Sequence, residues 1–359
     1  MNKKLRVGIL GATGFVGQRL VTLLTDHPYF DVTVVAASSR SAGKSYEEVV
    51  GSKWKLDIPM PEWVKPMVIR NLNNIEEVKD DVDFVFCAVN MDKNTIKQLE
   101  EAYAKAEIPV VSNNSAHRMT QDVPVIVPEI NASHLAIIDA QRKRLGTKKG
   151  FIATKPNCSI QSYVPPLTAL LEFEPTKVVV STYQAVSGSG KTLKEWPEME
   201  DNIIPFISGE EEKSEQEPLK VWGHIENDEI KFVEGITISA QCIRVPVLDG
   251  HLATVSVSFK KKPTKEQILA KWAEYSGRPQ ELGLPLAPKQ FITYFEEDNR
   301  PQTHLDRNIE KGMGITVGRL REDNIFDYKF VGLSHNTLRG AAGGAVLMAE
   351  LLYKEGYLE

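Results

Sequence analysis

Hydrophobic positions follow two different patterns along the chain. In the first part, short apolar runs alternate with a segment whose apolar residues recur at helical spacing. Strands are predicted at Leu5–Leu10, Asp31–Ala37 and residues 82–90, residues 108–119 are predicted to be a strand with its exit loop, and a helix is predicted at Lys93–Lys105. Strands that alternate with helices indicate βαβ units, and therefore a doubly wound parallel sheet.

After residue 156 the pattern changes to longer runs that are apolar or alternate with polar residues, which is typical of a mostly antiparallel sheet. The predicted strands are residues 176–186, 235–247, 251–260 and 314–322. Helical patterns lie at residues 160–173, 264–275 and 338–354. The acidic segment 208–220 is interpreted as a loop or an exposed helix rather than a core element. The second part is thus predicted to be an α+β domain.

These patterns predict a Rossmann-type α/β domain over residues 1–156 and an α+β domain with a mixed, mostly antiparallel sheet over residues 157–333. The segment 334–359 ends in a helix with small residues from Gly340 to Ala345. Small residues let a helix approach another backbone or a ligand closely. We therefore expect this helix to pack back on the first domain.

Length and charge narrow the classes of function. A chain of 359 residues is expected to form two domains, and a net charge of −5 argues against nucleic-acid binding, which needs a basic face. The three cysteines are few and far apart, which favours a reducing compartment. With neither a signal-peptide pattern nor a long apolar run, a cytoplasmic protein that does not bind membranes is expected. The seven histidines form no H-x-x-x-H pair, so no metal site is predicted.

A glycine-rich turn follows the first predicted strand. The stretch GATGFVGQRLVTLL places Gly11, Gly14 and Gly17 between that strand and a helical pattern. In a dinucleotide-binding turn, Gly11 would allow the tight bend, Gly14 would let backbone N–H groups approach a pyrophosphate, and Gly17 would let the helix pack closely on the strand. The G-x-x-G-x-x-G spacing is one residue longer at the front than the usual form. A tight turn without a ligand is therefore the alternative.

The second predicted strand ends without an acidic residue. The stretch AASSRS places Ser38, Ser39, Arg40 and Ser41 where an NAD-binding protein carries an Asp or Glu for the ribose. Hydroxyls and a guanidinium favour a 2′-phosphate instead. The loop therefore predicts NADP, and a solvated loop without a ligand is the alternative.

Cys158, in TKPNCSIQS, stands outside any apolar run. Pro156 is expected to end a strand, and Asn157 to cap a helix that begins near Ser159. A thiol at a helix N-terminus meets the positive end of the helix dipole and free N–H groups, which lower its pKa and can hold an oxyanion. This position favours a nucleophile over an inert cysteine. Cys87 lies within an apolar strand and is interpreted as a packing residue.

Three further residues are candidates to work with this thiol. Arg244 and His251 lie in QCIRVPVLDGHLATV, where a tight hairpin at the Leu-Asp-Gly turn would bring both to one side of a crevice. A guanidinium binds a carboxylate in a fork, and a histidine transfers protons near neutral pH. Arg118, in SNNSAHRM at a strand end, is predicted to bind an anionic group, with a surface salt bridge as the alternative.

The motifs together resemble one family, the aspartate-semialdehyde dehydrogenases. The stretches that carry the resemblance, in order, are GATGFVGQR, SSRSAGK, SNNSAHRM, PNCSIQ, TYQAVSGSG, EPLK, CIRVPVLDGH and SHNTLRGAAGG. They cover essentially the whole chain, and P-N-C-S is similar to the archaeal and fungal branch. The resemblance implies NADP-dependent reductive dephosphorylation of L-4-aspartyl phosphate to L-aspartate 4-semialdehyde through a cysteine thioester. This step belongs to lysine, methionine, threonine and isoleucine biosynthesis.

The resemblance also implies roles for individual residues. Cys158 would be the nucleophile, His251 the acid/base, and Gln184 the residue that orients the acyl group. Arg244 would bind the substrate α-carboxylate, and Glu217 would contact its amino group. The implied phosphate ligands are Arg118, Asn157 and Lys220. The implied cofactor contacts are Gly11, Ala12, Thr13, Gly14, Phe15, Val16, Ser38, Ser39, Arg40, Ser41, Ala88, Ser187, Gly188 and Asn336. Family members associate as homodimers or dimers of dimers through the sheet of the second domain.

Other functions remain as alternatives at this point. A malonyl-CoA reductase would use the same cysteine, histidine and arginine on a thioester, with less need for Glu217 and Lys220. An N-acetylglutamyl-phosphate reductase usually places its cysteine in a P-G-C-Y-like context, which this chain lacks. A non-catalytic NADP-binding regulator would not need the intact set of nucleophile, base and anion-binding residues.

Overall fold

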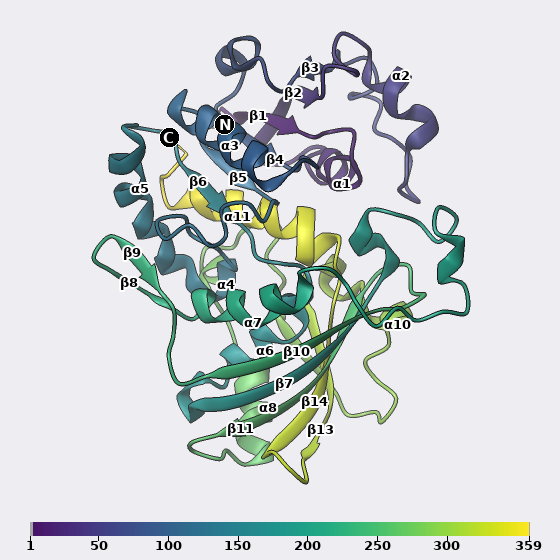
Figure 1. Ribbon diagram of the computed structural model, residues 1–359, viewed down its shortest axis with the longest axis vertical. Coiled ribbons are helices and arrows are strands. Elements are labelled where there is room, and N and C mark those ends of the chain that lie inside the picture. Colours follow the sequence, from purple (N-terminus) through teal and green to yellow (C-terminus); the bar gives the residue numbers. More distant parts are fainter. Residues whose placement is uncertain (1–2, 359) are drawn as a thin grey trace.

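The computed structural model describes residues 3–358, which form two six-stranded sheets and a small two-stranded one. Figure 1 shows the two large sheets one above the other, with the C-terminal helix α11 (Gly343–Lys354) between them. Both chain ends lie beside the first sheet (Figure 1). Among the residues described, no helix has the length and apolar character needed to cross a membrane.

The first sheet is parallel throughout, in the strand order β3-β2-β1-β4-β5-β6. This is the doubly wound order of dinucleotide-binding folds, so the predicted Rossmann-type sheet is confirmed. Its strands are β1 (Leu5–Leu10), β2 (Phe30–Ala37), β3 (Arg70–Asn71), β4 (Phe84–Cys87), β5 (Val110–Ser112) and β6 (Ile152–Thr154). The helices of this part are α1 (Phe15–Leu23), α2 (Tyr46–Val50), α3 (Lys93–Lys105), α4 (Pro128–Asn131) and α5 (Ile138–Leu145). Helices cover the sheet, which is why its strands read as continuous apolar runs.

The second sheet is mixed, in the order β10-β7-β11-β14-β13-β12. The pairs β7–β10 and β12–β13 are parallel and the others antiparallel, as predicted. Its strands are β7 (Pro175–Gln184), β10 (Thr237–Arg244), β11 (His251–Phe259), β12 (Ile292–Phe295), β13 (Ile315–Glu322) and β14 (Tyr328–Ser334). Around it lie α6 (Val164–Thr168), α7 (Glu210–Val221), α8 (Lys265–Glu274), α9 (Arg278–Glu281) and α10 (Thr303–Asp306), and a hairpin of β8 (His224–Glu226) and β9 (Glu229–Lys231).

Two predicted segments differ in the structure. The single helix expected over residues 160–173 is broken into a 3₁₀ turn at Ser159–Ser162, the short α6 and a further turn. Pro165 and Pro166 are the reason, because proline lacks an N–H group and is tolerated only in the first turn of a helix. The acidic segment 208–220 is not a loop: it forms α7, and one face of α7 is buried.

Helix α11 packs against the first sheet, as its small residues predict. Its buried side chains, Val346 and Leu347 among them, belong to the same hydrophobic cluster as Val7 and Phe84. A π-helical turn, η10 (Leu338–Ala342), leads into it. The division near residue 156 remains our prediction.

Candidate active site

Three adjacent strand ends bring together side chains that are far apart in the sequence. Arg244 ends β10 and pairs in register with Gln184, which ends β7. His251 begins β11, and β11 runs antiparallel to β7 on its other side. The expected hairpin between Arg244 and His251 is therefore wrong. Strand β7 lies between β10 and β11, so the segment that joins β10 to β11 passes over the end of β7. Arg244, Gln184 and His251 therefore lie at the same end of three neighbouring strands.

Cys158 faces this edge. Its Sγ lies 3.4 Å from Nε2 of His251, and its side chain is partly exposed. The Oδ1 atom of Asn157 accepts a 2.8 Å hydrogen bond from the Ser159 backbone N–H. The expected helix is only the 3₁₀ turn Ser159–Ser162, whose N-cap position is Cys158 rather than Asn157, and no side chain caps it. So short an element contributes little dipole to the thiol.

The expected low pKa of the Cys158 thiol is contradicted. Burial raises the pKa of Cys158 above its ordinary value, and Glu210 adds to the increase. Lys155, Arg118 and Arg244 oppose it, because their positive charges stabilise the thiolate. The thiol without substrate is therefore largely protonated near neutral pH, and neighbouring cations rather than a helix dipole favour its ionisation.

The hydrogen bonds of His251 fix the tautomer of its ring, and its surroundings keep the ring neutral. The Ala185 backbone N–H donates to Nδ1 at 3.0 Å, so the proton of the neutral ring is on Nε2, which faces the sulfur. Burial, followed by the charge of Arg244, holds the pKa of His251 well below 6.5. In this structure His251 therefore presents a neutral N–H donor to Cys158.

Arg244 completes this side of the site. It is buried, and its Nη1 donates to the Ala185 carbonyl at 2.6 Å. Among residues 3–358, the buried Nε atom of this guanidinium has no hydrogen-bond partner. Gly188 lies against it: a Cβ atom there would be 2.9 Å from Nη1 of Arg244 and 3.0 Å from Cε1 of His251. An unpaired guanidinium donor in such a confined site suits a substrate carboxylate.

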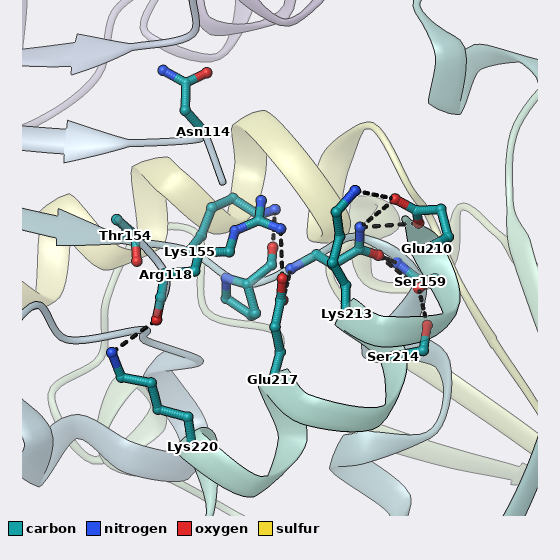
Figure 2. A network of polar contacts seen from close by, with 12 residues as sticks. Asn114, Arg118, Thr154, Lys155, Ser159, Glu210, Lys213, Ser214, Glu217 and Lys220 are labelled. Carbon is teal, nitrogen blue, oxygen red and sulfur yellow. Dashed lines mark hydrogen bonds and ion pairs between the residues drawn. The ribbon is translucent and has the colours of Figure 1, made fainter. Parts of the chain in front are cut away.

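Helix α7 supplies a second group of polar side chains, shown in Figure 2. Its Glu217 accepts a 2.9 Å hydrogen bond from Nη1 of Arg118 and a 2.5 Å bond from the backbone N–H of Asn157. Arg118 and Glu217 are both buried. The alternative of a surface salt bridge for Arg118 is therefore wrong, and the structure places Arg118, Asn157 and Glu217 together.

Lys220 bonds to backbone carbonyls in this structure. It is 1% exposed, and its Nζ donates to the carbonyls of Arg118, Thr120 and Val123 at 2.8, 2.6 and 2.9 Å. An ammonium has three N–H donors, and all three are used. In this structure Lys220 ties α7 to the loop that carries Arg118.

Two buried charges near the thiol were missed at the sequence level. Glu210 accepts bonds from the Asn157 side chain at 3.0 Å and from Lys213 at 2.8 Å, and Gln184 Nε2 lies 3.4 Å away. It begins the helix that was interpreted as a solvated segment. Lys155 is 3% exposed and immediately precedes the Pro-Asn-Cys motif. Its position beside that motif was the available signal.

The glycine turn has the geometry of a dinucleotide site. Gly11 has a φ of +85°, and a Cβ there would be 2.5 Å from the Ala88 carbonyl oxygen. A Cβ on Gly17 would be 2.3 Å from the Gly11 carbonyl oxygen, so only glycine fits. Gly14 precedes α1, and no side chain caps that helix, which leaves its first N–H groups for an anion. Around these glycines, Ala12 is buried, while Thr13, Phe15 and Val16 are partly exposed.

A cleft of about 810 Å³ extends from Phe15 of α1 to Ser187 and Asp249 of the second part. The Oγ atom of Ser187 donates to Asp249 at 2.7 Å and accepts from Nδ2 of Asn336 at 2.8 Å. Ser187 thus lines the cleft, Asn336 is hydrogen-bonded to it, and Gly188 is the next residue along the chain. Among residues 3–358, no cluster of three or more His, Cys, Asp or Glu side chains is arranged for a metal ion.

The loop predicted to bind the 2′-phosphate follows the carboxyl end of β2. Ser39 and Arg40 are exposed, and Ser38 and Ser41 are half-buried. The Ser41 backbone N–H donates to the Ser38 carbonyl at 2.9 Å, which makes the segment a tight turn. The hydroxyls and the guanidinium therefore remain together at the edge where ligands of such sheets bind.

Comparison with known proteins shows which family this chain resembles. The family model "Semialdehyde dehydrogenase, NAD binding domain" matches residues 6–138, and "Semialdehyde dehydrogenase, dimerisation domain" matches residues 165–339. The chain is 43% identical to the aspartate-semialdehyde dehydrogenase of Aspergillus fumigatus over 99% of each chain. It is 42% identical to that of Archaeoglobus fulgidus, over 97% of this chain and 98% of the relative.

A solved structure gives the same result in three dimensions. The crystal structure of aspartate-semialdehyde dehydrogenase with NADP from Candida albicans superposes with a TM-score of 0.87 at 37% identity, over 99% of this chain and 100% of that one. Both family models, the full-length relatives and the structural match show that the chain belongs to the aspartate-semialdehyde dehydrogenase family.

Proposed function

We propose that this chain catalyses the NADP-dependent reductive dephosphorylation of L-4-aspartyl phosphate to L-aspartate 4-semialdehyde, in the biosynthesis of lysine, methionine, threonine and isoleucine. The observation that carries the proposal is the 3.4 Å contact between Cys158 and His251, with two cationic groups nearby. Arg244 and Arg118 both act on the Cys158 thiol, and two separate cations suit a substrate with a carboxylate at one end and a phosphate at the other.

In the proposed reaction the Cys158 thiolate attacks the acyl carbon, and the bond from that carbon to the phosphate oxygen breaks. Arg118 and Lys220 remain the predicted ligands of the departing phosphate, whose charge they would neutralise, with Asn157 beside them. Gln184 orients the acyl group, and Glu217 remains the predicted contact for the amino group. Arg244 holds the α-carboxylate.

When bound, NADPH supplies the hydride that reduces the thioester. His251 takes up the proton that the Cys158 thiol loses on attack and, as imidazolium, returns a proton from Nε2 to the thiolate that departs or to the oxygen of the intermediate that becomes the aldehyde, since Nε2 already points at the reacting sulfur. The glycine turn before α1 and the confined position of Gly188 fit a dinucleotide that runs through the crevice.

An assay of the reverse reaction tests this function. Purified protein with aspartate semialdehyde, NADP and inorganic phosphate is expected to produce NADPH at a rate that depends on phosphate. The same protein with malonyl-CoA and NADPH is the control for the malonyl-CoA reductase alternative. Faster turnover of malonyl-CoA, or semialdehyde oxidation that does not respond to phosphate, would contradict the proposal.

The cofactor preference follows from the loop at the end of β2. A few charge-assisted bonds to a 2′-phosphate are expected to give roughly 2–3 kcal/mol, about a 30- to 150-fold preference for NADP over NAD. Ser38→Asp should erase or invert this preference, because the carboxylate repels the 2′-phosphate and accepts from a ribose hydroxyl. Titration of both cofactors at fixed ionic strength measures it, and Ser38→Ala separates the lost hydroxyl from the added charge. Equal affinity of the wild type for both cofactors would contradict this prediction, and Arg40 would then be interpreted as a solvated surface residue.

Self-association is indicated by the match to a dimerisation domain. We propose a homodimer, or a dimer of dimers, that uses the second sheet. Strand β10 is an edge strand of this sheet, and the side chains of Val179, Ile203 and Phe206 in the second part of the chain are apolar and exposed, as an interface would require. Location in the cytoplasm remains a prediction from the cysteine pattern.

A further inference from the structure

A lysine of the first part of the chain contacts a segment of the second part across the cofactor cleft. The Nζ atom of Lys55, in the loop that follows α2, donates to the Gly190 carbonyl at 2.8 Å and to Glu195 at 3.0 Å. We call these two contacts the Lys55 bridge. Lys55 and Glu195 both line the cleft that extends from Phe15 to Ser187. We propose that Lys55 is a positioning residue for the cofactor, which holds the segment of Ser187 against the glycine turn. This inference rests on the proposed function only through its cofactor.

The backbone of Lys55 is fixed to the glycine turn by one buried amide. The Oε1 atom of Gln18 accepts a 2.9 Å hydrogen bond from the Lys55 backbone N–H. Its Nε2 atom donates to the carbonyls of Thr13 and Lys53 at 3.1 and 3.2 Å. Gln18 is 1% exposed, and a buried amide that loses its partners costs free energy, so this arrangement is favoured over others. Lys55 is therefore held at a fixed place relative to Thr13, a predicted cofactor contact.

The other end of the Lys55 bridge is joined to the reacting residues. Gly190 has a φ of +75°, and its N–H donates to the Ser187 carbonyl at 2.9 Å, which closes a 3₁₀ turn. Ala185 immediately precedes this turn. Its N–H donates to His251, and its carbonyl accepts from Arg244. Movement of Gly190 would therefore displace Ser187, a predicted cofactor contact, from its place beside the reacting residues.

Glu195 is ordered by its own segment before it meets the lysine. Its carboxylate accepts a 2.9 Å hydrogen bond from the Thr192 backbone N–H, and its own N–H donates to Oγ1 of Thr192 at 3.3 Å. Little further entropy is lost when the carboxylate binds Lys55. The hydrogen bond from Lys55, more than any other contact, lowers the pKa of Glu195, so this carboxylate is charged at neutral pH. In Figure 1 the loop after α2 extends toward this segment, which is drawn in teal.

Charge and exposure indicate what the Lys55 bridge does. The side chains of Lys55 and Glu195 are 24% and 45% exposed, so their ion pair alone contributes little to the stability of the fold. Three further lysines line the cleft and are exposed: Lys53, Lys191 and Lys194. General attraction of an anionic cofactor therefore does not depend on Lys55. Lys55 differs by its bond to a carbonyl on the opposite side of the cleft, and this bond aligns the two sides that the dinucleotide must contact together.

Binding of NADPH to the full-length protein tests this role without turnover. Fluorescence titration at fixed ionic strength compares wild type with Lys55→Met, which keeps a long side chain without a donor. We expect Lys55→Met to raise the NADPH Kd by about 3- to 10-fold, the usual effect of losing one or two partly exposed hydrogen bonds. Lys194→Met is the matched control: it removes the same charge from the same cleft and should change Kd by less than about twofold. Lys55→Arg keeps the donors and should bind NADPH as wild type does.

A second pair of variants separates a positioning residue from a direct ligand of the cofactor. Glu195→Gln removes the charged partner of Lys55 but keeps an oxygen for Thr192. If Lys55 acts through the bridge, Glu195→Gln should weaken NADPH binding about 2- to 5-fold relative to Glu198→Gln, an exposed control that loses the same charge. Lys55→Met should then have a smaller effect in the Glu195→Gln background, because both changes break one contact. A lysine that bound a cofactor phosphate directly would instead be released, and Glu195→Gln would tighten binding.

Steady-state kinetics adds a measurement that a general loss of stability would not reproduce. Lys55→Met should raise the KM for NADP and leave the KM for inorganic phosphate within about twofold of wild type, with the melting temperature as the folding control. Two results would overturn the proposal: a folded Lys55→Met protein whose NADPH Kd changes no more than that of Lys194→Met, or tighter NADPH binding in Glu195→Gln than in Glu198→Gln. Failure of the proposed function looks different, because wild type would not oxidise aspartate semialdehyde while the NADPH titrations would keep their outcome.

Discussion

Replacing Cys158 with alanine is expected to abolish turnover while NADP still binds. The sulfur is the only group at the centre of the site that can form the covalent acyl intermediate, and without it the acyl transfer has no path. Loss of a covalent nucleophile lowers kcat by orders of magnitude. Cys158 lies outside the glycine turn and the β2 loop, so NADP affinity should not change. Steady-state kinetics and a fluorescence titration with NADPH measure the two quantities.

The other two cysteines are matched controls for this variant. Cys87 is buried in β4 and Cys242 in β10, and both are packing residues in the structure. Cys87→Ala and Cys242→Ala should therefore retain most activity. The thioester mechanism would be wrong if Cys158→Ala kept more than about a tenth of wild-type turnover, far above the loss expected for a nucleophile.

His251→Asn is expected to lower kcat by about 10² to 10⁴, the usual contribution of a positioned acid or base. Asparagine is too short to place a donor where Nε2 meets the Cys158 sulfur, although its Oδ1 can still accept from the Ala185 N–H. His251→Gln is the informative companion, because its longer amide can supply an N–H donor near that position but cannot transfer a proton.

The pH profile of the wild type provides a second measurement for His251. Because burial and Arg244 keep the pKa of His251 well below 6.5, the ring stays neutral at and above that pH. We therefore expect no loss of activity from protonation of His251 between about pH 6.5 and pH 8. An unchanged kcat in His251→Asn would contradict the acid/base role of His251 and would mean that water or another residue transfers the proton.

Local patterns were enough to predict the fold class and the reacting residues. Buried parallel strands are continuous apolar runs, and the conformation of a tight βα turn requires glycine at Gly11, so both leave a direct trace in the sequence. The order of the motifs was enough to name the family, because each stretch retains residue types that its chemistry needs. The prediction of secondary structure was wrong where a local sequence pattern was ambiguous. The acidic residues of α7 resemble a solvated segment, and nothing nearby in the sequence indicates that Glu210, Glu217 and Lys220 face a buried cluster.

The sequence by itself determined the family and the fold class, and it predicted a dinucleotide turn, a nucleophilic cysteine with a histidine partner, and a set of cations for an anionic substrate. Only the tertiary structure decided how those groups work together. Hydrogen bonding and desolvation depend on which atoms meet, and these atoms come from segments far apart in the chain. Packing of α7 on the loop of Arg118 occupies every donor of Lys220. Burial likewise raises the pKa of the Cys158 thiol, which a helix N-terminus alone would have lowered.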